Sequence, residues 1–305
     1  MNKEHRLKYY GWSLGDRYDG WRIRNVDPIF SVIPYILRTR IDSQIFFQEK
    51  INIDPIEAFI RLHKKDIPDL SIMHVIMAAL VRLMSQRPHL NRFVVWNKIF
   101  ARNYVSFSLA VKSAMSDEGE EMTVKPYFLP TDTLVDVVRK TNIEIENNQH
   151  AGKQNTADII AKVFAYLPDL LLRATVSLIL LLDKIGIMPR FIHLASPFHS
   201  SFFLTNIGSV GIESIYHHLY EIGTCSLFVS MGKKTRINVL EKDGQIKSNK
   251  SIQLKFVLDE RICDGFYYAL SMRMLVKILA DPSVLLLPPE KVIVDEGVGK
   301  KRRDI

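Results

Sequence analysis

Residues 201–211 read SFFLTNIGSVG, and residues 258–269 read LDERICDGFYYA. The first stretch begins with the aromatic and aliphatic residues typical of a strand, and Asn206 and Gly208 indicate a sharp end to that strand. In the second stretch, Asp264-Gly265 predicts a turn, after which an apolar run is typical of a helix. The joint order and spacing of the two stretches decide the fold prediction.

The regions around these stretches alternate between strand-like and helix-like patterns. We expect a strand over 41–53, a helix after Asp54-Pro55, and a buried helix over 71–86 that Ser71 caps. Two strand-like runs lie within 93–112, and a hairpin turning at Asp243-Gly244 joins two later strands. Together these elements predict one α+β domain with a mixed or mostly antiparallel sheet.

Composition excludes several classes of protein. The 305 residues are 47% hydrophobic and 24% charged, which is typical of a globular protein and not of a disordered or fibrous one. Two cysteines are too few for a disulfide framework or a cysteine-rich metal site, and we expect no metal. The opening residues, MNKEHRLKYYGW, lack the apolar core of a signal peptide, so we expect a cytoplasmic location.

The net charge of +8 favours an anionic partner, such as a nucleotide-bearing cofactor, nucleic acid or an acidic membrane surface. Most of the basic residues are dispersed, and no zinc-finger spacing or aromatic-studded basic helix accompanies them, so we expect no nucleic-acid partner. The clearest basic run is Lys300 to Arg303, within a C-terminal tail over 286–305.

The apolar stretch between Arg173 and Asp183 is too short for a bilayer span, which needs ~20 apolar residues. It lies in an apolar helical insertion over about 158–190. One interpretation is a helix pair that is buried or contacts another subunit. The alternative is a helix on a membrane surface, with 163–190 and the basic tail as a peripheral membrane contact.

The two quoted stretches resemble the catalytic domain of 2-oxoacid dehydrogenase dihydrolipoyl acyltransferases, a fold shared with chloramphenicol acetyltransferase. The resemblance extends over 28–285, preceded by an N-terminal arm over 1–27. It implies a chloramphenicol acetyltransferase-like two-layer α+β sandwich with a mixed sheet, a homotrimer, and coenzyme A or another pantetheine thioester as co-substrate.

Three departures from the family pattern stand out. No lipoyl or subunit-binding domain precedes the matching region, which predicts that the protein is not a conventional complex component. The apolar segment 163–190 is longer than the usual connection. In DERICDG, Glu260 occupies the position of the histidine that serves the family as general base.

The resemblance also implies roles for individual residues. Thr205 matches the hydroxyl that stabilises the oxyanion, Asp264 matches the aspartate that orders the loop, and Glu260 matches the base. An ordinary glutamate carboxylate is about four pKa units less basic than a thiolate, so it is a poor substitute for histidine. His217, His218 and, less directly, His199 are the alternative bases. Residues expected to contact the cofactor are Asn206, Gly208 and Gly265.

The leading functional hypothesis is coenzyme A-dependent acyl transfer from a thioester, carried by acyl-CoA or an acyl carrier, to an unknown acceptor. One alternative is a catalytically degenerate family member that serves as a structural or ligand-binding trimer, because the motif histidine is replaced. A second alternative is a membrane-peripheral acyl-handling protein.

Overall fold

Two β-sheets form the framework of the structure, a computed structural model that describes residues 5–112, 121–150, 162, 164–240 and 244–303. Their strands are β1 (Gly20–Arg22), β2 (Gln44–Asn52), β3 (Arg92–Val95), β4 (Lys98–Arg102), β5 (Val105–Lys112), β6 (Glu121–Val124), β7 (Tyr127–Phe128), β8 (Phe202–Asn206), β9 (Leu227–Leu240) and β10 (Ile246–Asp259).

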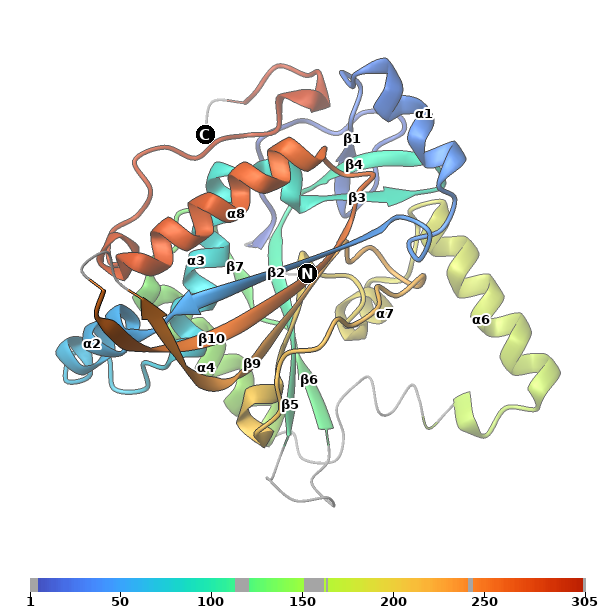
Figure 1. Ribbon diagram of the computed structural model, residues 1–305. Coiled ribbons are helices and arrows are strands. Elements are labelled where there is room, and N and C mark those ends of the chain that lie inside the picture. Colours follow the sequence, from blue (N-terminus) through green and yellow to red (C-terminus); the bar gives the residue numbers. More distant parts are fainter. Residues whose placement is uncertain (1–4, 113–120, 151–161, 163, 241–243, 304–305) are drawn as a thin grey trace.

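Within the described residues, the larger sheet has seven strands in the order β2-β10-β9-β8-β5-β6, and the short β7 pairs with β5. β8 pairs in parallel with both β5 and β9, whereas the other pairs are antiparallel. The smaller sheet has the order β1-β4-β3 (Figure 1). The predicted mixed sheet is therefore confirmed.

Helices α2 (Asp54–His63), α3 (Ile72–Gln86), α4 (Leu134–His150) and α8 (Gly265–Ala280) cover one face of the larger sheet (Figure 1). The other described α-helices are α1 (Pro28–Ile36), α6 (Asp169–Lys184) and α7 (Arg190–Ala195). Short 3-10 helices are η2 (Pro88–Asn91), η3 (Ile207–Val210), η4 (Pro282–Leu285) and η5 (Glu296–Val298). Helices on one side of a mixed sheet give the predicted two-layer α+β class.

The main core lies between α3, α8 and the sheet. Ser71 caps α3 by accepting a hydrogen bond from the backbone nitrogen of His74, and most of the helix behind it is buried. The prediction of a buried helix at 71–86 is confirmed. Side chains at alternate positions of β8 to β10, such as Leu204, Val229 and Phe256, pack in this core.

The opposite face of the sheet carries a smaller apolar cluster that includes Phe203, Phe228 and Val257. We call this side the outer face. Because side chains alternate along a strand, Thr205 lies on the outer face with Phe203, and Asn206 lies on the helix-covered face. This alternation decides which candidate residues can meet.

The region 93–112 forms three strands, β3, β4 and β5, rather than the two predicted. Trp96 and Asn97 both have positive φ angles, of 48° and 59°, and form a tight turn between β3 and β4. Two successive left-handed residues are typical of a two-residue hairpin. Sequence reasoning missed this turn because tryptophan rarely adopts that conformation.

The N-terminal arm and the C-terminal tail pack on the body of the protein and on each other. Trp21 of β1 is buried in the main core, and the backbone of Arg303 donates a hydrogen bond to the carbonyl of Tyr9. A buried ion pair joins Arg92 of β3 to Asp295 of the tail, with hydrogen bonds of 2.6 and 2.7 Å. Lys300 of the basic run is paired with Asp16.

Helix α6 projects from the body (Figure 1), and Asp183 is its one buried residue. The interpretation that this helix is buried in the core is therefore wrong for a single chain, because apolar side chains such as Leu170, Leu178 and Leu181 are exposed. Residues 158–161 and 163, at the start of the predicted insertion, lie outside the described part. Among the described helices, none is long and apolar enough to cross a membrane.

A buried ion-pair network fixes the C-terminal end of α6. Arg17 pairs with both Asp19 and Asp183, and Nε2 of His199 lies 3.2 Å from the Asp183 carboxylate. Burial alone would raise the pKa of Asp183, but the hydrogen bond with His199 and the charge of Arg17 hold it at about 2. The folded protein therefore strongly favours the ionised carboxylate.

We predict that Asp183→Asn lowers the free energy of unfolding by about 3 kcal/mol at pH 7, because it leaves a buried guanidinium without its second carboxylate. The folded-state pKa lies below the unfolded value, so this stabilisation is complete above pH ~4 and is lost as the pH falls toward 2. Urea unfolding of both proteins checks this. A difference in unfolding free energy between the two proteins that stays constant from pH 7 to pH 2 would contradict this prediction.

Candidate active site

Strand register separates the two motif stretches within one chain. Thr205 of β8 pairs with Ser230 of β9, which pairs with Lys255 of β10. Glu260 lies five residues further along, a distance of about 17 Å at ~3.4 Å per residue. Thr205 and Glu260 of the same chain therefore lie at opposite ends of the sheet and cannot share one reacting group.

The loop that carries Glu260 is ordered by its neighbours. The carboxylate of Asp259 is buried and forms two hydrogen bonds with the guanidinium of Arg261, at 2.8 and 2.7 Å. The backbone nitrogen of Glu260 donates to the carbonyl of Ser43, while its side chain is only partly buried. Asp264 caps α8 by accepting a hydrogen bond from the backbone nitrogen of Tyr267 at 2.7 Å.

The two candidate histidines lie on a segment that crosses the outer face. The hydroxyl of Ser230 accepts a hydrogen bond from the backbone of Ile215, and the ring of His217 stacks on Phe228 with centroids 4.2 Å apart. Phe228 is two residues from Ser230, the strand partner of Thr205. His217 is therefore about 7 Å along the sheet from the level of Thr205, on the same face.

A hydrogen bond fixes the tautomer of His217. Its Nδ1 lies 3.0 Å from the carbonyl oxygen of His218, and a carbonyl can only accept. Nδ1 therefore carries the hydrogen, and Nε2 of the neutral ring has a lone pair available to accept a proton. His218 is more exposed and stacks on His217. Of the two, His217 is the one whose ring packs on the sheet face that carries Thr205.

Arg40 anchors the end of this segment. Its guanidinium donates hydrogen bonds to the carbonyls of Tyr220, Glu221 and Gly223, and it lies 4.0 Å from the Asp259 carboxylate. One buried arginine thus joins the segment that carries His217 to the loop that carries Glu260.

Two further residues near the motif stretches, the candidate His199 and the thiol of Cys263, are buried in surroundings that disfavour a catalytic role. His199 is fully buried, where its ring nitrogens meet Ser196 and Asp183, and burial lowers its pKa. Burial raises the pKa of the Cys263 thiol to about 12, which opposes its use as a nucleophile. Within the described residues, no group of three or more histidine, cysteine or acidic side chains is arranged to hold a metal.

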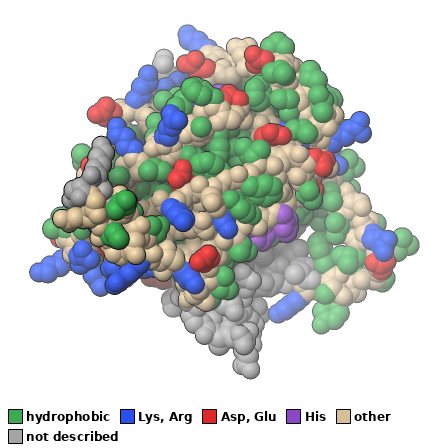
Figure 2. All heavy atoms as spheres, viewed as in Figure 1, with side chains coloured by type: hydrophobic (Ala, Val, Ile, Leu, Met, Phe, Trp, Pro, Cys, Tyr) green, Lys and Arg blue, Asp and Glu red, His purple; other side chains and the backbone are tan. Residues whose placement is uncertain are grey.

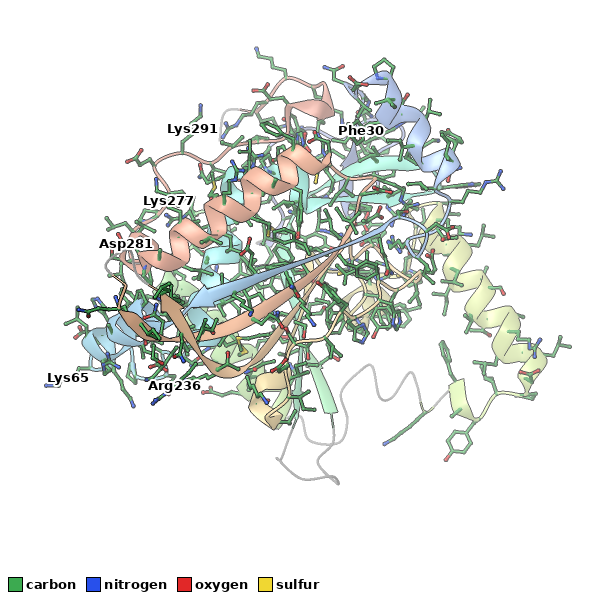
Figure 3. All side chains as sticks on the ribbon, in the orientation of Figure 1. Phe30, Lys65, Arg236, Lys277, Asp281 and Lys291 are labelled. Atoms are coloured by element: carbon green, nitrogen blue, oxygen red, sulfur yellow. The ribbon has the colours of Figure 1, made fainter. Side chains whose placement is uncertain are left out.

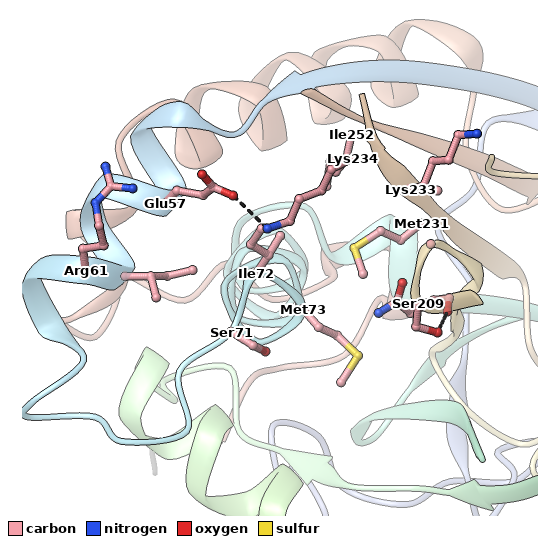
Figure 4. Close-up of a pocket in the computed structure, with 14 residues that line it drawn as sticks. Glu57, Arg61, Ser71, Ile72, Met73, Ser209, Met231, Lys233, Lys234 and Ile252 are labelled. Atoms are coloured by element: carbon pink, nitrogen blue, oxygen red, sulfur yellow. Dashed lines mark hydrogen bonds and ion pairs between the residues drawn. The ribbon is translucent and has the colours of Figure 1, made fainter. Parts of the chain in front are cut away.

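A pocket of about 560 Å³ opens beside the end of β8, between α2, the start of α3 and β9 (Figure 4). Asn206 and Gly208, two of the predicted cofactor residues, line it, whereas Gly265 lies at the opposite end of the sheet. The pocket also has an apolar wall formed by Ile60, Ile72, Met73, Met231 and Ile252.

Basic side chains surround the mouth of this pocket. Arg61, Lys233 and Lys234 line it, and Figure 4 shows the ion pair between Lys234 and Glu57 across it. Hydrogen bonds from Lys234 and Lys250 lower the pKa of Glu57 to about 2, so its carboxylate stays ionised. Basic atoms gather at this end of the molecule in Figure 2, and Lys65 and Arg236 lie there in Figure 3.

Residues 196–287 match the family model of the 2-oxoacid dehydrogenases acyltransferase (catalytic domain). The structure is similar to a dihydrolipoamide acetyltransferase from Azotobacter vinelandii, with 14% identity, a TM-score of 0.50, and coverage of 85% of this chain and 89% of that one. The predicted resemblance is confirmed. The likeness to the solved structure establishes the acyltransferase fold rather than a shared activity.

Two further solved structures have this acyltransferase fold. A probable dihydrolipoamide acetyltransferase from Listeria monocytogenes has 13% identity and a TM-score of 0.52, covering 88% of this chain and 95% of that one. A truncated catalytic core of the 2-oxoacid dehydrogenase multienzyme complex from Thermoplasma acidophilum has 14% identity and a TM-score of 0.50, covering 86% and 99%. No curated protein sequence matches this chain.

Sequence reasoning missed residues that shape the acyltransferase-like site. Asp259 and Arg261 lie inside the quoted motif, but their ion pair needs the loop conformation to be known. Arg40 is distant in sequence from both motif stretches, and no pattern around it indicates its contacts with them. The basic residues of the pocket were counted only in the net charge, because nothing in their spacing shows that α2 and β9 bring them together.

Backbone contact at the end of β8 leaves no room for a side chain at Gly208. A Cβ there would lie 2.7 Å from the backbone nitrogen of Lys233 and closer still to the carbonyl group of Gly232. The close approach holds η3 against β9 and thereby sets one wall of the pocket. At Gly265, by contrast, a Cβ would meet open space.

We predict that Gly208→Ala lowers the free energy of unfolding by about 1–3 kcal/mol, since backbone atoms must move to admit the methyl group. Gly265→Ala, in the first turn of α8, is expected to be neutral or slightly stabilising, because alanine favours a helix. Chemical denaturation measures both variants. Equal stability of the two would show that the end of β8 is less tightly packed than described.

Proposed function

We propose that this protein catalyses coenzyme A-dependent acyl transfer, with coenzyme A bound at the pocket at the end of β8 and its thioester reacting on the outer face. The observation that supports this most directly is the pairing of an apolar wall with a basic mouth beside Asn206 and Gly208. The match of residues 196–287 to an acyltransferase catalytic domain agrees with this chemistry.

The pocket suits the two chemically different parts of coenzyme A. Its apolar wall, which includes Met73 and Met231, fits the aliphatic stretches of the pantetheine arm. Its mouth keeps an excess of positive charge that attracts phosphate groups. Among the described residues that line it, Glu57 is the single carboxylate, beside Arg61, Lys233 and Lys234. We place the phosphates at the mouth, and the arm passes around the end of β8 at Asn206, from the helix-covered face that holds the pocket to Thr205 on the outer face.

In the proposed reaction, Nε2 of His217 accepts the proton of the attacking thiol. The thiolate attacks the thioester carbonyl, and a C–S bond forms while the carbonyl electrons move to oxygen. The hydroxyl of Thr205 donates a hydrogen bond to that oxyanion. When the intermediate collapses, the original C–S bond breaks and the departing thiolate takes the proton from His217, so the enzyme returns to its starting state.

Spacing along the sheet favours His217 over Glu260 as the base. The offset of about 7 Å between His217 and Thr205 allows one thioester and its attacking thiol to lie between them. Glu260 can meet Thr205 only if it comes from a second copy of the chain, as in the expected homotrimer. The trimer, like the domain boundaries at 27 and 285, stays a prediction.

A structural or ligand-binding role without catalysis is the second candidate. It is favoured by Glu260 at the position of the family's histidine, together with a loop whose order depends on Asp259 and Arg261 instead. The membrane-peripheral alternative gains less support, since Lys300 of the basic tail is paired with Asp16 and the tail packs against the arm.

We predict that His217→Gln lowers kcat/KM by about 10²–10⁴-fold, the range typical of a lost general base. Thr205→Val is expected to lower kcat by about 10²-fold through the lost oxyanion hydrogen bond. Glu260→Gln should change kcat/KM by less than about threefold. A panel of acyl-CoA donors and thiol acceptors measures turnover.

The same panel separates the two candidate functions. Loss of activity in Glu260→Gln, with His217→Gln unaffected, would make Glu260 the base. The absence of turnover by the wild-type protein across the panel would leave the non-catalytic role.

We predict that Arg61→Glu/Lys233→Glu weakens coenzyme A binding at least about tenfold, because it reverses two charges at the pocket mouth. Lys277→Glu is the matched control, since Lys277 lies on the solvent-exposed side of α8, away from the pocket (Figure 3). Calorimetric titration with coenzyme A, at low and at high salt, measures the affinity of both variants. Equal affinities for the two variants would contradict the proposed location of the phosphates.

A further inference from the structure

The solvent-facing side of α6 carries apolar residues at alternating spacings of three and four. Leu171, Ala174, Leu178, Leu181 and Ile185 follow this pattern, which places them in one stripe along the helix. We call this stripe the α6 seam. Its four large side chains are each 45–55% exposed, and Ala174 is exposed too.

The seam is separate from the face that holds α6 on the body. Val176, Ile179 and Leu180 lie on the other side of the helix, where they line an apolar cavity of about 180 Å³ with Phe198 and Ile192. Asp183 is fixed by Arg17 on that same side. The helix therefore has one apolar face toward its own chain and a second one that its own chain leaves exposed.

Spacings of three and four are typical of a helix that packs against another helix with side chains interlocked. Two heptads are too short for an independent coiled coil, but α6 is already folded and anchored by the rest of the chain. The pattern thus indicates a helical occupant.

The exposed area matches what a contact between two proteins requires. Leu170, Ile187 and the four large seam residues, at on the order of 100 Å² each, expose ~600 Å². This approaches the ~800 Å² that each partner buries in a standard interface. It is at the upper end of the apolar patches found on monomers. Figure 2 shows the apolar atoms of this region on the side of the molecule where α6 projects.

We infer that the α6 seam binds the α6 seam of a second copy of this chain, in an antiparallel, twofold-symmetric pair. A twofold axis lets one stripe serve as both surfaces of the contact, so no separate partner surface is needed. Antiparallel packing places helix ends of opposite partial charge together. Parallel packing would set Lys184 beside its own equivalent.

In this register Ala174 lies opposite Leu178 of the second copy, and Leu171 lies opposite Leu181. The contact does not use the outer face of the sheet. It therefore pairs two copies whether the rest of the protein is monomeric or trimeric, giving a dimer or a hexamer respectively.

Light scattering and sedimentation of the full chain test the pair. We expect Leu178→Lys/Leu181→Lys to halve the mass of the assembly and to leave the melting temperature within about 2 °C, because both side chains are half exposed in a single copy. Leu62→Lys on α2, which alters a leucine that is 74% exposed, is the matched control and should keep the full mass.

Cross-linking tests the orientation. Ala174→Cys/Leu178→Cys should form an intermolecular disulfide on oxidation, and Ala174→Cys alone should not, because only parallel packing sets residue 174 beside itself. The native cysteines, Cys225 and Cys263, are both buried. A mass unchanged by the lysine pair would overturn the inference, as would binding of wild type, but not of the lysine pair, to phosphatidylglycerol vesicles without a change of mass.

Discussion

The parallel pairing of β8 with both β5 and β9 is the constraint on which the arrangement of the site depends. Because the register of β8 is fixed on both edges, its alternation sends Thr205 to the outer face and Asn206 to the helix-covered face. The close contact between Gly208 and Gly232 then ends the strand abruptly and leaves the pocket beside it. A shift of one residue would exchange the two faces and separate the hydroxyl from His217.

Charge is divided between two tasks in this molecule. The ion pairs of Arg17, Arg92 and Arg261 are buried, and each joins segments or orders a loop whose backbone would otherwise lack a fixed position. The basic residues at the pocket mouth are exposed, so they add little to stability but create an attractive field for an anion. The buried arginines are neutralised by their carboxylate partners, so the net charge of +8 comes from exposed basic residues such as those at the pocket mouth.

Much of the fold was predictable from sequence, because the buried helix at 71–86, the strand at 41–53 and the order of the two motifs are encoded by local pattern. The third strand in 93–112 was not predictable, since it depends on Trp96 adopting a positive φ. The identities of Thr205, His217 and His218 as candidates came from sequence. The separation of Thr205 from Glu260 could only come from the register, because pairing between distant strands leaves no mark in the spacing of residues.

The motif around Glu260 shows why resemblance in a loop does not establish catalysis. Asp259 orders the loop through Arg261, Asp264 caps α8, and Arg40 ties the loop to the segment that carries His217. Each of these interactions favours folding whether or not residue 260 accepts a proton. A chain can therefore retain most of this sequence for structural reasons while the base changes or moves. The outer face, which carries both Thr205 and the ring of His217, is the place where the proposed catalysis must be tested.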